Sequence, residues 1–182
     1  MTKYVYMGIA AVLLLYIIRT YNSLVSARNT VKEAFASMDV YLKQRWDMIP
    51  NVVEIVKGYT KHEEGTFAHI VSLRNKAYSS MSMEEKVQTG NEISESLSRM
   101  LALSEAYPDL KASANFMDLS EKLAAVESSI ASSRKYYNGA VKNYNNLCQR
   151  FPSNIIARIF GFEKYDSFNV REEERNNVQI RF

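Results

Sequence analysis

Residues 24–59 read LVSARNTVKEAFASMDVYLKQRWDMIPNVVEIVKGY and carry the pattern of a long helix. Apolar residues recur along it at alternating spacings of four and three, the pattern of a helix face that packs against other helices. Nine of the eleven positions on this face are apolar: Leu24, Arg28, Val31, Phe35, Met38, Leu42, Arg45, Ile49, Val52, Val56 and Tyr59. The stretch predicts a helix about 54 Å long at 1.5 Å per residue. Because the face keeps its phase beyond Pro50, we expect a kink there and not an end.

An uncharged segment precedes this helix. Residues 4–18 lie between Lys3 and Arg19 and carry no charge. Fifteen residues are fewer than the roughly 20 that a membrane-spanning helix needs, but the Arg19 side chain can reach toward the headgroups and the flanking residues can lengthen the segment. We therefore expect residues 1–20 to form a transmembrane anchor.

A cleaved signal peptide is the alternative interpretation of this segment, because small residues at 25–27 suit a signal peptidase. The distribution of positive charge predicts the orientation. Lys3 and the amino terminus precede the apolar segment, whereas Arg19, Arg28 and Lys32 follow it. Since positive charge marks the cytoplasmic side, we expect a single-pass protein of the cell membrane, with its N-terminus outside and the remainder in the cytoplasm.

Two shorter helices are predicted next. Gly58 indicates the end of the first helix, and Thr60 with Glu63 can form a capping box for the second. The second helix should fade in the polar stretch 79–90, and Asn91 should cap a third that ends at Pro108. The expected apolar faces are Phe67, Ile70, Val71 and Ala77 or Tyr78 in the second helix, and Ile93, Leu97, Met100, Leu101 and Ala106 in the third.

A fourth helix carries the most regular pattern. Ten of eleven positions between Phe116 and Phe151 are apolar at the same spacing, and Pro152 should end the helix. The sequence thus predicts an all-α protein, an N-terminal transmembrane helix followed by a long antiparallel four-helix bundle over residues 21–162. Residues 163–182 are expected to be a charged tail that contains three consecutive glutamates. Its last residues alternate and could form a short extended strip: Val178, Ile180 and Phe182.

Composition excludes several classes of protein. With 23 Lys and Arg against 20 Asp and Glu in 182 residues, the net charge is only +3, too even for a dedicated nucleic-acid binder. The 6 Gly and 3 Pro leave little turn material for an all-β chain. A single cysteine, Cys148, excludes an intramolecular disulfide and Cys-based zinc clusters.

Catalytic and metal-binding motifs are weak. A zinc protease needs a second histidine one helical turn after His62, and Thr66 stands there. His69 could share the face of His62, but no third ligand can be identified. The sequence has no glycine-rich phosphate loop and no G-x-S-x-G elbow, and Cys148 lies beside an apolar helix position with no arranged base. We predict no enzymatic activity, no cofactor and no metal.

Polar residues on the helix faces are expected to form a polar core layer that fixes helix register. Arg28 and Arg45 occupy apolar-stripe positions and would need partners among Asp39, Asp47, Glu105, Glu121 and Glu127 if buried. Two pairs of asparagines, each seven apart, could form an interhelical amide ladder near the membrane. The members of the layer are Asn22, Arg28, Asn29, Arg45, Asn138 and Asn145. A pocket for a small ligand is the alternative.

Several stretches together resemble the LemA family of bacterial membrane-anchored helical proteins. They cover nearly all of residues 1–162 in the family's order: Tyr21-Asn22-Ser23-Leu24-Val25, Lys43-Gln44-Arg45-Trp46-Asp47-Met48-Ile49-Pro50-Asn51, Glu105-Ala106-Tyr107-Pro108-Asp109-Leu110, Tyr137-Asn138, Tyr144-Asn145 and Phe151-Pro152-Ser153-Asn154. The resemblance implies a single-pass anchor, a four-helix bundle in the cytoplasm and no enzymatic activity. One magnetosome paralogue of the family is associated with making membrane compartments, which favours a membrane-organising role.

The segment after Pro152 is the best functional candidate. We expect Ser153 or Asn154 to cap a short amphipathic turn, and Gly161 to close it. Because the fourth helix should return toward the membrane, this turn could contact headgroups or a partner's transmembrane helix. The candidate contact residues are Ile155, Ile156, Arg158, Ile159 and Phe160. The alternative is that they cap the bundle core.

The predicted function is a non-enzymatic scaffold or interaction protein at the cytoplasmic face of the bacterial membrane. Its expected partners are the lipid bilayer and other membrane or membrane-associated proteins, without nucleic acid. A homo-oligomer is compatible with the heptad pattern. The alternatives are a sensor or transport-linked module that binds a small ligand in the bundle, and a hydrolase.

Overall fold

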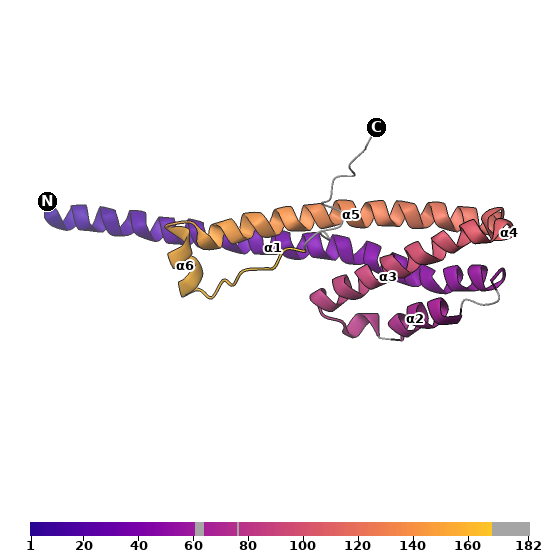
Figure 1. Ribbon diagram of the computed structural model, residues 1–182. Coiled ribbons are helices and arrows are strands. Elements are labelled where there is room, and N and C mark those ends of the chain that lie inside the picture. The colour runs from indigo at the N-terminus through magenta and orange to yellow at the C-terminus, as the bar shows by residue number, and fades with distance from the viewer. Residues whose placement is uncertain (61–63, 76, 169–182) are drawn as a thin grey trace, which may run out of the picture. The chain divides into compact units, whose positions relative to one another are not determined.

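The structure is a computed structural model that describes residues 1–60, 64–75 and 77–168, with the side chains of residues 64–67 left out (Figure 1). The described residues form helices and no strand, which confirms the all-α prediction. The helices are α1 (Thr2–Lys57), α2 (Glu64–Arg74), α3 (Met83–Leu103), α4 (Pro108–Lys111), α5 (Ala114–Gln149) and α6 (Ser153–Ile159), with 3-10 turns η1 (Tyr78–Ser80) and η2 (Ser104–Ala106).

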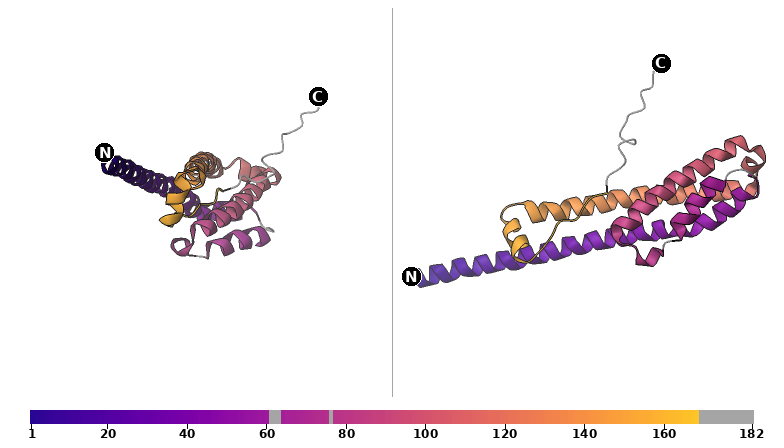
Figure 2. Two further views of the ribbon diagram at one scale, coloured as in Figure 1. Left: turned by 90° about the vertical axis from the view of Figure 1, so that its left-hand side faces the viewer. Right: turned by 60° about the horizontal axis from the view of Figure 1, so that its bottom comes forward.

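Helix α1 joins the predicted anchor and the predicted first helix without a break, as both views of Figure 2 show. Pro50 lies inside it, and the helix continues to Lys57, so the prediction that the proline does not end the helix is confirmed. The amide of Gly58 donates to the carbonyls of Glu54 and Ile55 and closes the last turn. The apolar members of the predicted face are buried, except Tyr59, which is exposed.

The start of α3 differs from the prediction. Asn91 lies inside the helix, which begins at Met83. The Ser82 hydroxyl accepts from the amide of Glu85, and the Glu85 carboxylate accepts from the amide of Ser82, so the two form a capping box. This pair lies within the polar stretch where the preceding helix was expected to fade. Glu63 lies outside the described residues, so the capping box predicted at Thr60 and Glu63 stays a prediction.

Helix α5 has the predicted length of 36 residues and lies two residues from the predicted position. Helix α6 follows it as expected, but neither Ser153 nor Asn154 caps it: Pro152 occupies the N-cap. The Ser153 hydroxyl instead donates back toward the carbonyls of Leu147 and Arg150 at the end of α5. Gly161, which has φ +67°, ends the turn after α6, a conformation that favours glycine.

The chain divides into two compact units. The first comprises residues 1–35 and 134–182, and the second comprises residues 36–133, so α1 and α5 each run through both. Helices α2 and α3 belong to the second unit alone, and α6 belongs to the first. The antiparallel four-helix bundle over residues 21–162, and the division into anchor, bundle and tail, therefore stay predictions.

The core of the second unit is apolar and draws on four long or medium helices and on α4. Its buried members are Trp46, Ile49, Val52, Val53 and Val56 of α1, Ile70 and Leu73 of α2, Ile93, Leu97 and Met100 of α3, Leu110 of α4, and Phe116, Leu119 and Leu123 of α5. Val71, expected on the apolar face of α2, is exposed, and Leu73 is buried in its place. The side chain of Phe67 lies outside the described residues.

Candidate functional site

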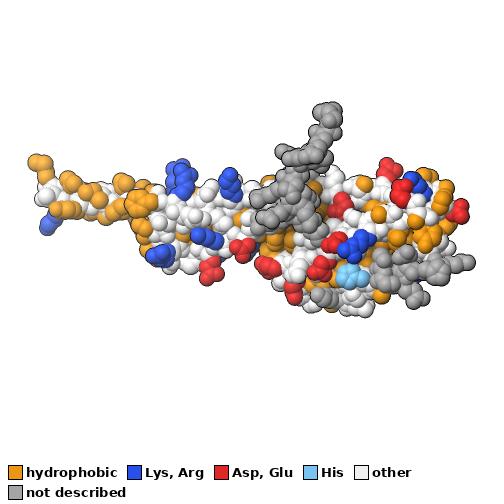
Figure 3. Space-filling model, viewed as in Figure 1, with side chains coloured by type: hydrophobic (Ala, Val, Ile, Leu, Met, Phe, Trp, Pro, Cys, Tyr) orange, Lys and Arg blue, Asp and Glu red, His pale blue; other side chains and the backbone are white. Residues whose placement is uncertain are grey.

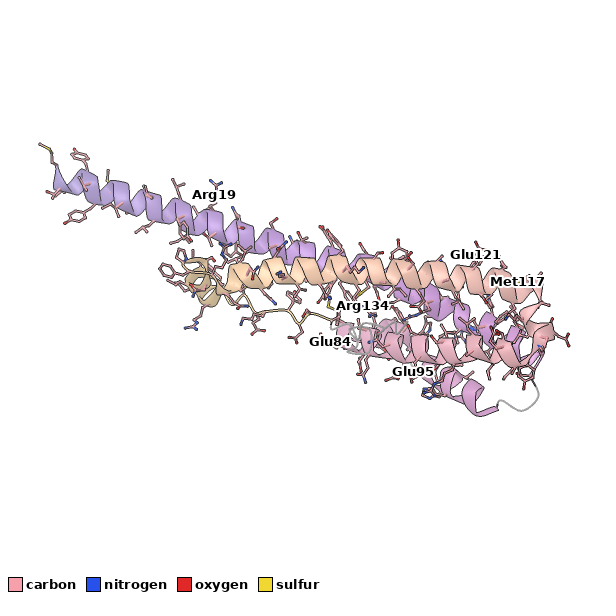
Figure 4. The ribbon with its side chains drawn as sticks, turned by 45° about the horizontal axis from the view of Figure 1, so that its top comes forward. Arg19, Glu84, Glu95, Met117, Glu121 and Arg134 are labelled. Atoms are coloured by element: carbon pink, nitrogen blue, oxygen red, sulfur yellow. The ribbon has the colours of Figure 1, made fainter. Side chains whose placement is uncertain are left out.

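The amino-terminal part of α1 is apolar and exposed. Most large side chains between Tyr4 and Ile18 are exposed, and this part appears in Figure 3 as a nearly continuous hydrophobic surface. Arg19 projects outward from α1 where this surface ends (Figure 4). The helix is long and apolar enough to cross a membrane by length and composition. An exposed apolar helix of this length suits the interior of a bilayer.

Helix α6 packs against α1 next to the end of this surface. The ring of Tyr21 meets the ring of Phe160 edge to face, with 4.9 Å between centroids, and meets that of Phe162 at 5.6 Å. The guanidinium of Arg28 lies 5.2 Å from the centre of the Phe162 ring, within the range of a cation–π contact. Tyr21 follows Arg19 by two residues, so these contacts place α6 at the boundary of the apolar segment.

The candidate contact residues of α6 divide into two groups. Ile156 is buried and holds the helix against the protein, together with Ala157. Ile155, Ile159 and Phe160 are exposed, by 51%, 70% and 51%, and Arg158 is exposed beside them. A short helix that exposes three large apolar side chains next to a cation is typical of a surface that meets headgroups or another apolar surface. We name these four residues the α6 surface.

A hollow adjoins the α6 surface. It is lined by the end of α5, by α6 and by Lys164: Cys148, Gln149, Asn154, Ile155, Ala157, Arg158, Ile159, Phe162 and Lys164. Arg158 and Lys164 give it positive charge at neutral pH. Burial raises the pKa of the Cys148 thiol, which therefore stays protonated near neutrality and is a poor nucleophile. Cys148 is half-buried.

The asparagine ladder expected between the first and last helices is wrong. Asn22 and Asn29 are exposed on α1 and do not belong to a buried layer. Asn138 and Asn145 of α5 are half-buried, but their amides pair with the backbone of Phe168 and Tyr165. Seven-residue spacing places the amides on one helix face, and an extended segment of the same chain covers that face.

That segment forms the first part of the expected tail. Residues 163–168 lie extended along α5, as Figure 1 shows after α6, and are anchored by hydrogen bonds to its side chains. We call residues 163–168 the strap. The alternating residues Val178, Ile180 and Phe182 lie outside the described residues.

A comparison with protein-family models matches the LemA family over residues 34–182 of this chain. The chain belongs to the LemA family. Among characterised proteins it is similar to magnetosome protein MamQ 2 of Paramagnetospirillum magneticum, 20% identical over 177 residues, which covers 83% of this chain and 65% of that protein. It is also similar to protein LemA of Metamycoplasma hominis, 23% identical over 158 residues, covering 86% of this chain and 72% of that protein. The chain thus spans about 65% of the length of the MamQ relative.

In this LemA-family chain, Arg45 is buried in the second unit and donates hydrogen bonds from both outer nitrogens, whereas its buried Nε has no partner among the described residues. One outer nitrogen donates to the carboxylate of Glu127 at 2.6 Å and to the hydroxyl of Ser94, and the other donates to the carbonyl of Gly90 at 2.6 Å. Glu127 was one of the five candidate partners. Glu121, another candidate, is exposed on α5 (Figure 4). The arginine ties α1 to α3 and α5, as a register-fixing role requires.

A second polar cluster of the second unit was missed from the sequence. The Tyr78 hydroxyl donates to the Asp39 carboxylate at 2.7 Å, and Lys86 pairs with the same carboxylate at 2.8 Å. The Lys86 ammonium also lies 4.8 Å from the centre of the Tyr78 ring. Burial and the bond to Asp39 raise the pKa of Tyr78 well above its ordinary value, so it remains a donor at neutral pH.

Metal-binding and catalytic groups do not converge in the part of the chain that the structure describes. Within those residues, no group of three or more His, Cys, Asp or Glu side chains could hold a metal ion. His69 is exposed on α2, and His62 lies outside the described residues. The site with the most distinctive surface is therefore the end of the first unit, where the α6 surface adjoins the apolar segment of α1.

Proposed function

We propose that this LemA-family chain is a non-enzymatic, membrane-anchored helical scaffold at the cytoplasmic face of the bacterial membrane, and that the α6 surface rests in the headgroup layer. The observation that carries the proposal is the contact between Tyr21 and Phe160, with 4.9 Å between ring centroids. It joins α6 to α1 two residues beyond Arg19. If residues 1–20 span the bilayer, α6 lies at the level of the headgroups.

The chemistry of the α6 surface supports this proposal. Exposed Ile155, Ile159 and Phe160 would lose contact with water in the interfacial layer, and Arg158 would meet phosphates there. The hollow beside them places Lys164 near Arg158, which adds a second cation for an anionic headgroup. A scaffold fixed in this way would have membrane proteins within reach of its first unit.

The depth of α6 can be measured directly. In a Cys148→Ala chain reconstituted in vesicles with anionic lipid, an environment-sensitive fluorophore is attached through Ile159→Cys. The matched control attaches it through Lys142→Cys, on an exposed position of α5 in the same unit. We expect blue-shifted emission and quenching by lipid-borne quenchers at position 159 alone. Equal, water-like emission at both positions would refute docking.

Replacement of Ile159, the most exposed apolar side chain of the α6 surface, by alanine separates docking from capping of the core. Docking predicts an unchanged melting temperature with weaker lipid quenching of a fluorophore on Ile155→Cys. Capping predicts a large loss of thermal stability in detergent, where no bilayer is present.

Orientation is tested by protease treatment of spheroplasts that contain a C-terminally tagged chain. A tag protected until lysis agrees with a cytoplasmic scaffold. A tag digested in intact spheroplasts contradicts the positive-charge argument and moves the proposed role to the outer face.

A further inference from the structure

Two tyrosine–asparagine pairs on α5 bind the backbone of the strap. Asn145 donates to the carbonyl of Tyr165 at 2.8 Å and accepts from the amide of the same residue at 3.1 Å. Asn138 does the same with Phe168, at 2.8 and 2.9 Å. Each side-chain amide thus pairs with both polar groups of one residue, as a neighbouring strand would in a sheet.

The tyrosines contact two further carbonyls of the strap. The Tyr144 hydroxyl donates to the carbonyl of Glu163 at 2.8 Å, and the Tyr137 hydroxyl donates to that of Asp166 at 3.3 Å. Burial raises the pKa of Tyr144 well above its ordinary value, so this donor keeps its proton at neutral pH. We call Tyr137, Asn138, Tyr144 and Asn145 the Tyr-Asn ladder.

The ladder repeats because two periods coincide. Its pairs are seven residues apart, which is about 10.5 Å along a helix at 1.5 Å per residue. The strap residues that they contact are three apart, which is about 10 Å in an extended chain. The strap runs opposite to α5, since Tyr144 and Asn145 contact residues 163 and 165, while Tyr137 and Asn138 contact residues 166 and 168. The helix face is therefore a template for an extended peptide.

Side-chain recognition adds two aromatic positions. The Phe168 ring stacks on Tyr137 at 4.8 Å and lies 6.5 Å from Phe35, and the Tyr165 ring meets Tyr144 edge to face at 5.4 Å. The remaining strap side chains are exposed: Glu163, Lys164, Asp166 and Ser167. What the ladder selects is an extended backbone with aromatic residues three positions apart, and the other positions are open to any side chain.

The strap is also incompletely buried. Both of its aromatic side chains, Tyr165 and Phe168, are only half-buried. Release of the strap would expose the ladder at the cost of these two half-buried rings and of the hydrogen bonds to the ladder.

From these contacts we propose that the Tyr-Asn ladder is a peptide-binding site: it takes an extended segment of a partner protein, with aromatic residues at positions i and i+3, in exchange for the chain's own strap. The strap shows the chemistry of the ligand, because the ladder contacts only backbone groups and two rings. The proposal does not depend on the depth of α6 in the membrane.

The test uses a fluorescent peptide with the sequence of residues 162–168, FEKYDSF, and the full chain in detergent. In wild-type protein the strap competes from a tethered position, so added peptide should bind weakly. In the full-length Tyr165→Ala/Phe168→Ala chain the strap is weakened, and the peptide should bind at least about tenfold more tightly. Adding Asn138→Leu and Asn145→Leu should abolish this binding.

Backbone recognition is tested with N-methylated peptides. Methylation at the amides of Tyr165 and Phe168 removes both donors to the asparagines and should weaken binding by about tenfold or more. The matched control is methylated at Lys164 and Ser167, whose amides the ladder does not contact, and should bind like the unmodified peptide. No saturable binding to the strap-weakened chain, or equal loss with both methylated peptides, would overturn the proposal.

Hydrogen exchange tests the proposal in the wild-type chain, without the Tyr165→Ala/Phe168→Ala variant. In the wild-type chain, the amides of Tyr165 and Phe168 should exchange more slowly than those of Lys164 and Ser167, and excess peptide should remove the difference. Unchanged exchange under excess peptide contradicts displacement. A concentration-dependent dimer that disappears in the Asn138→Leu/Asn145→Leu chain, without peptide binding, would identify a second copy as the occupant and overturn the partner-protein proposal.

Discussion

Replacing Gly90 by alanine should destabilise the second unit, although alanine is the better helix former. A Cβ built at Gly90 would lie 2.9 Å from Nη2 of Arg45 and 3.2 Å from Cδ2 of Leu42. The same Nη2 donates to the Gly90 carbonyl at 2.6 Å. The guanidinium must move to admit the methyl group, and because Arg45 is 1% exposed, no water replaces the contacts that it loses.

The magnitude follows from two opposing terms. Alanine for glycine inside a helix stabilises by about 1 kcal/mol. Loss of a hydrogen bond from a charged donor costs about 1.5–3 kcal/mol, so the net loss is about 0.5–2 kcal/mol. At about 2–4 °C per kcal/mol for a chain of this size, the melting temperature should fall by about 1–8 °C.

Gly139→Ala is the matched control. Gly139 lies inside α5, is exposed, and a Cβ there would meet nothing within 4 Å. It should gain about 1 kcal/mol and melt about 2–4 °C higher than wild type. The assay is thermal unfolding of the full chains in detergent, followed by circular dichroism. A Gly90→Ala chain at least as stable as wild type would refute the reasoning about Arg45.

Three further predictions concern the second unit. Glu127→Ala should cost at least about 1 kcal/mol more in wild type than in an Arg45→Met chain, since only wild type keeps a buried cation, and a thermal double-mutant cycle measures this difference. Ser82→Ala should lower the melting temperature by about 2–4 °C, because the chain loses about 1 kcal/mol of stabilisation from the N-cap of α3. A smaller fall in the melting temperature would contradict the capping box. Because the folded pKa of Tyr78 is raised, its contribution is complete below about pH 10 and is lost as pH rises further; Tyr78→Phe should therefore show a shallower fall in melting temperature between about pH 9 and pH 11.

Much of the fold could be predicted from periodicity. The four-three spacing identified α1 and α5 because long helices repeat their apolar face many times. The start of α3 was missed because the stretch 79–90 is polar, although Ser82 and Glu85 have the spacing of a capping box. The capping-box spacing was present, but it involves only two residues. In a stretch that is polar throughout, such a pair does not stand out.

The sites were harder to predict, because the pattern of a helix face does not show which segment of the chain packs on it. The seven-residue spacing of Asn138 and Asn145 was found, yet the partner is an extended segment 20 and 30 residues further along the chain. Asp39 and Tyr78 are likewise separated by 39 residues, and no local pattern links them. The sequence offered five carboxylates as candidate partners of Arg45, and only the structure shows that the partner is Glu127.

The matching periods of helix and strap restrict how the lengths of these two segments can change. One residue inserted into α5 between Asn138 and Asn145 would rotate one amide by about 100° relative to the other and shift it by about 1.5 Å, so that only one could still face the strap. One residue inserted between Tyr165 and Phe168 would lengthen that part of the strap by about 3.3 Å, so that its backbone groups could no longer meet both asparagines. Length changes that preserve the ladder come as seven residues in the helix together with three in the strap. Insertions and deletions between the ladder residues should therefore occur as seven residues in α5 together with three in the strap. Other length changes should fall outside these two segments, whose lengths are coupled although they lie apart in the sequence.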